Sequence, residues 1–176
     1  MLTGKNIKLQ ALEPSNIEIL CQWENDTSIW IHSNTMTPYS RHILEQYISN
    51  SHQDIYTTKQ LRLMISSINN RMLGCIDLFD FDPNNRKAGV GILIGHKKDR
   101  RKGYASEALS ILINYAFQTL NLNSLYCNIS INNLPSLNLF RKHNFEIVGT
   151  KKEWIRNGNE WIDEYLLQLI APKYLV

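Results

Sequence analysis

The sequence predicts one domain of the mixed α/β class: a single, mostly antiparallel sheet of about seven strands with helices on both faces. Three observations predict it. The apolar patterns follow the order β-α-α-β-β-β-α-β-α-β-β along the chain. Short turns join the strands of each hairpin, whereas one long helix connects two central strands, as a parallel crossover requires. The whole chain, residues 1–176 with 43% hydrophobic content, can bury one core as a single domain.

The N-terminal part contributes one strand and two helices. Residues 6–12 alternate apolar and polar side chains, which indicates a strand. A helix over residues 14–23 follows, with Ser15 as its N-cap. Ser40 is expected to cap a second helix, over residues 41–50.

The central part contributes three strands and the crossover. Strands are predicted for residues 59–68, 72–81 and 87–95, separated by the turns INNR and DPNNR. A long amphipathic helix over about 104–120 then leads to a strand over 124–130.

The C-terminal part closes the sheet. A short helix is expected within residues 132–144. The last two strands, over residues 145–155 and 160–170, are joined by the hairpin turn RNGN.

Composition excludes several classes of protein. A net charge of +3, concentrated in one loop, argues against a nucleic-acid partner. The three cysteines lack metal-ligand spacing, and Cys75 and Cys127 lie in apolar strand patterns, so we expect buried thiols and no metal. Because no apolar stretch approaches about 18 residues and the start lacks an apolar signal region, we expect a cytoplasmic protein without membrane contact.

The most informative stretch begins at Lys97. Five of the six residues from 97 to 102 are Lys or Arg, and Gly103-Tyr104-Ala105 then opens the long helix. The first turn of a helix leaves backbone N–H groups unpaired, and anions settle there. Glycine lets a ligand approach the backbone closely. We therefore expect this loop to hold an anionic group, although a solvated basic turn is the plainer alternative.

Arg100, Gly103 and Ala105 fill the Arg/Gln-x-x-Gly-x-Gly/Ala signature of the GNAT superfamily of N-acetyltransferases, which the chain resembles along nearly its whole length. The resemblance is greatest to the branch with spermidine acetyltransferases and ribosomal-protein N-terminal acetyltransferases. It implies that acetyl-CoA is the co-substrate, with its pyrophosphate on the basic loop and its pantetheine arm between the fourth and fifth strands. The cofactor-binding residues it implies are Ile92, Leu93, Ile94, Arg100, Arg101, Lys102, Gly103, Tyr104, Ala105, Asn133 and Ser136.

The same resemblance leaves the catalytic side chains open. The Glu that many relatives use as a base falls at Gly89, or at Val90 with a shift of one residue, and their Tyr acid falls at Phe140. Asp77 lies between apolar neighbours in the middle of a strand, where a carboxylate is costly unless it is paired or used. We expect it to act as the base or to position the substrate amine; a structural ion pair is the alternative.

Two further residues are candidates. His143, near the end of the short helix, is a candidate proton donor to CoA, although a cation is favourable there anyway. Tyr39, between the first two helices, could line the acceptor pocket or simply pack.

The sequence predicts an enzyme that transfers an acetyl group to a primary amine by direct attack. The stretch from His32 to Tyr47 contains a single acidic residue, Glu45, which argues against a strong polycation site. A polyamine, a protein N-terminus and an amino sugar all remain open as the small-molecule or peptide acceptor. A non-catalytic acyl-CoA-binding module is the alternative, favoured by Gly89 and Phe140. The long apolar strand EYLLQLI would need cover, which suggests a homodimer.

Overall fold

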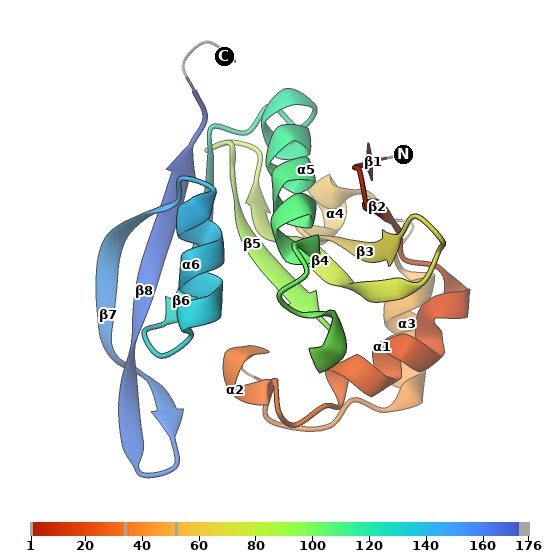
Figure 1. Ribbon diagram of the computed structural model, residues 1–176, viewed down its shortest axis with the longest axis horizontal. Helices are drawn as coiled ribbons and strands as arrows, with labels where there is room; N and C mark the ends of the chain where they lie inside the picture. The colour runs from red at the N-terminus through yellow and green to blue at the C-terminus, as the bar shows by residue number, and fades with distance from the viewer. Residues whose placement is uncertain (1, 34, 52, 173–176) are drawn as a thin grey trace.

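The computed structural model describes residues 2–33, 35–51 and 53–172, which form one eight-stranded sheet flanked by helices (Figure 1). The strands are β1 (Leu2–Thr3), β2 (Ile7–Ala11), β3 (Leu61–Ser67), β4 (Met72–Asp82), β5 (Lys87–Ile94), β6 (Ser124–Ser130), β7 (Glu146–Asn157) and β8 (Glu160–Ile170). The α-helices are α1 (Ile17–Glu24), α2 (Trp30–Ser33), α3 (Arg41–Ser49), α4 (Ile55–Thr58), α5 (Tyr104–Gln118) and α6 (Leu134–Lys142). Two 3₁₀ turns, η1 (Pro14–Asn16) and η2 (Lys97–Asp99), complete the described elements.

The sheet confirms the predicted topology. Its strand order is β1-β2-β3-β4-β5-β6-β8-β7, and the described pairs are antiparallel except β5 with β6. That parallel pair is joined by α5, which is the predicted crossover. The eighth strand is the two-residue β1, in which Leu2 lies opposite Leu9. A strand this short shows no periodicity, so sequence patterns could not reveal it.

The sheet has an apolar core on each face, as expected for helices on both sides. On one face, Leu109 and Leu112 of α5 and Phe140 of α6 pack onto the main core. On the other face, Leu20 of α1 and Leu44 of α3 form the smaller core. None of the helices in the described residues is long and apolar enough to cross a bilayer.

One of the two N-caps predicted from the sequence is confirmed by the structure. Ser40 caps α3 as predicted, because its Oγ accepts a hydrogen bond from the Ile43 N–H at 3.2 Å. The predicted cap at Ser15 is wrong. The chain first makes the 3₁₀ turn η1, where the Glu13 N–H donates to Oδ1 of Asn16 at 2.9 Å, and α1 begins only at Ile17. The one-turn helices α2 and α4 were not expected, since single turns leave too little pattern to detect.

Strand β8, whose expected exposed edge favoured a homodimer, needs no cover. Strand β8 lies between β6 and β7, so both of its edges are hydrogen-bonded within the chain. The edge strands of the sheet are β1 and β7 instead. The homodimer itself stays a prediction.

Candidate active site

A cavity opens where β5 and β6 separate. The two strands pair only from Lys87–Ser124 to Gly89–Tyr126 and diverge beyond that point. Because β4 bonds the other edge of β5, the edge of β5 that faces the gap is left with free backbone groups. The cavity has a volume of about 130 Å³ and is called the V cavity below. Its lining residues are Val90, Gly91, Ile92, Cys127, Asn128, Ile129, Ser130, Asn133, Ser136, Phe140, Ile155 and Glu164.

The V cavity gathers part of the predicted cofactor set. Ile92, Asn133 and Ser136 line it. Asn133 also caps α6, because its Oδ1 accepts a hydrogen bond from the Ser136 N–H at 3.3 Å. Leu93 and Ile94 do not line it; their side chains pack against the smaller and the main core, on opposite faces of the sheet.

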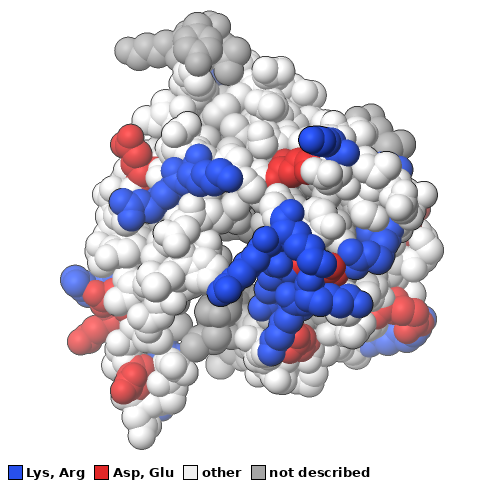
Figure 2. All heavy atoms as spheres, viewed as in Figure 1, with Lys and Arg blue, Asp and Glu red and all other residues white. Residues whose placement is uncertain are grey.

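The basic loop ends in an open helix N-terminus. Gly103 is the N-cap of α5 with φ +85°, and among the described residues no side chain caps this end of the helix. A Cβ placed on Gly103 would have no atom within 4 Å, so the backbone here is accessible to a ligand. The loop residues are exposed apart from Asp99, and Figure 2 shows Lys and Arg side chains gathered beside the opening between the α5 and α6 parts of the surface. An extended anion can reach both charges and free N–H groups.

Asp99 anchors this loop. Its side chain is buried and accepts two hydrogen bonds from Arg71, Nη1 to Oδ2 at 2.6 Å and Nη2 to Oδ1 at 2.9 Å. The hydrogen bond from Arg71 is the main cause that lowers the pKa of Asp99 to about 2. Lys102 approaches the same carboxylate at 3.5 Å, and Arg100 Nε donates to the Ile94 carbonyl at 3.3 Å. The loop is therefore tied to the β3–β4 turn and to the end of β5.

Asp77 lies beside the V cavity, but it is already paired. Arg62 donates to both of its oxygens, from Nε at 2.7 Å and from Nη2 at 3.0 Å. The same guanidinium donates to Glu24 of α1 at 2.5 Å and lies over the Tyr47 ring at 5.4 Å. Gly91 faces this carboxylate, since a Cβ there would stand 3.8 Å from Oδ2 of Asp77. Asp77 therefore forms the structural ion pair that the sequence left open as the alternative to a catalytic role. The pair lies next to the V cavity.

The two usual catalytic positions are filled by aromatic rings. A Cβ on Gly89 would lie 2.3 Å from the Phe79 ring, so that ring occupies the space of a side chain at this position. Val90 is 3% exposed and packs in the main core. Phe140 lines the V cavity with its ring edge-on to Phe145, at 5.0 Å between centroids. Neither position offers a group that can exchange a proton.

His143 and Tyr39 do not reach the cavity lining. His143 is half-buried, and its Nε2 lies 2.8 Å from Oγ of Ser106 at the start of α5. Burial, with a smaller effect of Lys142, lowers the pKa of His143. The backbone of Tyr39 exchanges two hydrogen bonds with Asn25, while its side chain is 41% exposed. Both remain predictions as catalytic or acceptor-binding residues.

Glu164 on β8 is a cavity residue that the sequence did not predict. It is the only acidic residue among the described residues that line the V cavity. Its Oε2 accepts a hydrogen bond from Lys151 at 3.0 Å, and Lys151 also donates to Asn128 at 2.8 Å. Within the described part of the chain, Oε1 of Glu164 has no partner. Glu164 is far in sequence from the cavity residues of β5, β6 and α6, and the pairing of β8 with β6, which sets it opposite Ser130, brings it there.

A larger groove adjoins the V cavity. It has a volume of about 560 Å³, within the range of small-molecule sites, and is called the acceptor groove below. Its lining residues are Trp30, Thr35, Met36, Trp154, Ile155, Arg156, Asn157 and Gly158. Ile155 lines both spaces. The two are therefore neighbouring parts of one site.

Together these features define a class of protein. A gap between two parallel strands, next to an open helix N-terminus with basic side chains, suits an acyl-CoA: the helix end receives phosphates and the gap receives the extended arm. A groove opening beside the gap gives a second substrate access. The fold and the site are those of an acyl-CoA-dependent acyltransferase.

Comparison with known proteins identifies the family of acyltransferases to which the chain belongs. The model of the acetyltransferase (GNAT) domain matches residues 6–146, so the chain belongs to the GNAT acetyltransferase family and transfers acetyl groups from acetyl-CoA to amines. Among its relatives, the N-acetyltransferase p20 of Bacillus licheniformis is 25% identical over 181 residues, covering 98% of this chain and 97% of that protein. A spermidine N(1)-acetyltransferase of Vibrio cholerae is 22% identical over 175 residues, covering 98% and 97%.

The fold also matches that of a solved structure from the same family. The structure of spermidine N-acetyltransferase from Vibrio cholerae in complex with CoA and spermine superimposes with a TM-score of 0.86 at 20% identity, covering 97% of this chain and 98% of that one. The expected family and fold are thus confirmed.

Proposed function

We propose that the protein acetylates a small primary amine or a peptide N-terminus by direct attack on acetyl-CoA bound along the basic loop and the V cavity. The single observation that carries this proposal is the separation of β5 and β6 after Gly89, which leaves a cavity between the basic loop and the acceptor groove. The three cysteines are free thiols, which fits a reducing, cytoplasmic location.

The residues present fit acetyl-CoA. The Gly103 backbone and the first turn of α5 would receive the pyrophosphate, with Arg100, Arg101 and Lys102 balancing its charge. Ile92, Asn133 and Ser136 would line the arm. The bound thioester supplies the acetyl group.

The chain must then remove a proton from the amine. A lysine-like amine has a pKa of about 10.4, so at neutral pH it arrives protonated and attacks only after losing a proton. Both oxygens of Asp77 already accept from Arg62, whereas Oε1 of Glu164 is unpaired among the described residues. We therefore assign proton acceptance to Glu164. Asp77, held by Arg62, positions the amine from the other side.

The test is the release of free CoA from acetyl-CoA, followed with a thiol reagent against an amine panel. The panel holds spermidine, putrescine, an amino sugar, L-phenylalaninamide and short peptides. Glu164→Gln should lower kcat on the order of 100-fold, the scale of general-base catalysis, with acetyl-CoA affinity unchanged. Glu160→Gln, an exposed carboxylate at the start of the same strand, is the matched control and should keep full activity.

Asp77→Asn should have a smaller effect, about tenfold on kcat/KM, because it perturbs position rather than proton transfer. If the two variants lose activity in the reverse order, Asp77 is the base. Acetyl-CoA binding without turnover of any amine would favour the non-catalytic binding module, for which the phenylalanine at position 140 is the specific observation.

A further inference from the structure

Two tryptophans line the acceptor groove, Trp30 from α2 and Trp154 from β7, and each has a hydrogen bond or a cation–π contact. Trp30 donates its Nε1–H to the Glu24 carbonyl at 2.9 Å. Trp154 lies under the Lys151 ammonium, 4.9 Å from Nζ to the ring centroid. Met36 adds an apolar side chain that is 88% exposed, and Ile155 continues the apolar lining toward the V cavity. Exposed apolar side chains that gather in one groove indicate a binding site more strongly than apolar side chains scattered singly over a surface.

Both tryptophans are linked to the carboxylates that flank the V cavity. Glu24, whose carbonyl holds Trp30, also binds Arg62, the partner of Asp77. Lys151, which covers Trp154, is the partner of Glu164. An acceptor whose body lies in the groove would extend its amine toward the V cavity, because Ile155 lines both spaces.

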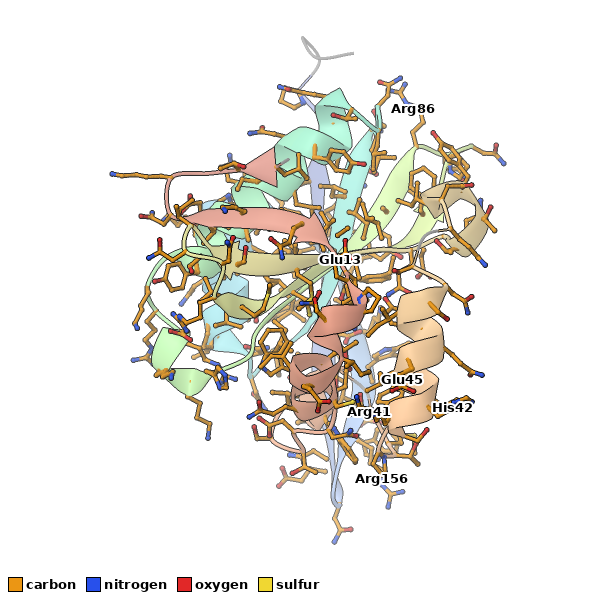
Figure 3. The ribbon with its side chains drawn as sticks, turned by 90° about the vertical axis from the view of Figure 1, so that its right-hand side faces the viewer. Glu13, Arg41, His42, Glu45, Arg86 and Arg156 are labelled. Atoms are coloured by element: carbon orange, nitrogen blue, oxygen red, sulfur yellow. The ribbon has the colours of Figure 1, made fainter. Side chains whose placement is uncertain are left out.

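The charges of the groove argue against a polycation. None of the described residues that line it is acidic, and Arg156 adds a positive charge near the tip of the β7–β8 hairpin (Figure 3). The two carboxylates at the cavity each have a cation of their own. The second and third ammonium groups of a polyamine would find no anionic partner in the groove.

We propose that the acceptor groove selects an amine with an aromatic or branched apolar body and a single positive charge, and that it discriminates against polyamines. This rests on the proposed acetylation of amines and adds the class of acceptor. The aromatic lining supplies apolar contact and ring stacking for such a body, which a polyamine cannot use as well.

The experiment compares L-phenylalaninamide with spermidine at saturating acetyl-CoA. The wild type should show a kcat/KM at least tenfold higher for L-phenylalaninamide. Trp154→Ala should lower that value about tenfold, mainly by raising KM. The matched control is Trp161→Ala, which removes a ring of similar exposure, 57% against 59%, from the same hairpin but outside the groove, and it should change kcat/KM less than twofold. Arg156→Gln should raise kcat/KM for spermidine about threefold.

The outcomes separate the two proposals. Equal or better use of spermidine, or equal losses in Trp154→Ala and Trp161→Ala, would overturn the groove proposal while acetylation stands. If no amine is acetylated, calorimetry of L-phenylalaninamide with the CoA-bound protein decides. Binding that Trp154→Ala abolishes supports the groove although acetylation has failed, and no binding by the wild type overturns it.

Discussion

The half of the site that receives the cofactor and the half that receives the amine are built in different ways. Most of the cofactor half is one continuous stretch, from Ile92 on β5 through the basic loop to the first turn of α5, to which the start of α6 adds Asn133 and Ser136, and backbone geometry carries much of it. The amine half is assembled from α1, β3, β4, β7 and β8, and it depends on ion pairs between distant side chains. The first half tolerates little change in backbone conformation, and the second little change in charge.

The largest expected effect concerns the charged cluster of the amine half. Arg62→Met leaves Glu24 and Asp77, whose side chains are only 17% and 15% exposed, without their cation. Breaking a buried pair this way should lower the free energy of unfolding by about 3 kcal/mol. Urea unfolding followed by circular dichroism measures it.

Arg41→Met is the matched control. Arg41 also bridges two carboxylates, Glu18 and Glu45, but all three side chains are at least half exposed, and Figure 3 shows Arg41 and Glu45 together on the surface of α3. Water screens such pairs, so the free energy of unfolding should hardly change. If Arg62→Met and Arg41→Met changed the free energy of unfolding equally, burial of the charges would not explain the stability of the cluster.

The second effect concerns the backbone of the cofactor half. Gly103→Val places a β-branched residue at φ +85°, which costs about 2 kcal/mol of strain, and removes the close approach of a ligand. The affinity for acetyl-CoA, measured by calorimetry, should fall about 30-fold. Gly158→Val imposes similar strain at φ +61° in the β7–β8 hairpin and should leave that affinity unchanged. A comparable loss in both would show that strain alone, not the ligand site, is responsible.

A third, smaller effect tests the anchor of the basic loop. The hydrogen bond from Arg71 lowers the pKa of Asp99 from its ordinary value of 3.8 to about 2, so folding favours the ionised form. The stabilisation is therefore complete above about pH 4 and lost as pH falls toward 2. Asp99→Asn should cost roughly 1 kcal/mol at pH 6, because Arg71 is half exposed and screened, and about half of that at pH 3. A difference from the wild type that does not shrink with acid would rule out this ion pair as the cause.

The smallest effect concerns the V cavity, where Phe140 of α6 lies. Phe140→Tyr adds a hydroxyl at the cavity, where relatives of this family place their acid. We expect kcat for CoA release to rise a few-fold, since the added hydroxyl could give a proton to the leaving thiolate. A fall in kcat with an unchanged melting temperature would show that the cavity does not admit the hydroxyl.

The difference between the cofactor half and the amine half also explains what the sequence could predict. The signature of Arg100, Gly103 and Ala105 is local, so both the loop and its helix followed from it, and α5 begins at Tyr104 as expected. The hairpins, the crossover and the burial of Cys75 and Cys127 followed from periodicity.

The amine half could not be derived in this way. Asp77 was visible as a lone carboxylate in an apolar strand, but its partner Arg62 is defined by the register of β3 with β4. Glu164 follows Asp163 in a strand whose two faces the alternation does not distinguish, and the β7–β8 ladder shifts register between Lys151 and Ile155. Only the three-dimensional pairing shows which carboxylate meets the cavity.

A crystal structure of the protein with CoA bound tests the central claim most directly. The account predicts the pyrophosphate on the Gly103 backbone and the first turn of α5, with the pantetheine arm between β5 and β6 and its sulfur near Phe140 and Glu164. CoA bound elsewhere, or a closed gap between β5 and β6 with the arm outside it, would contradict the account.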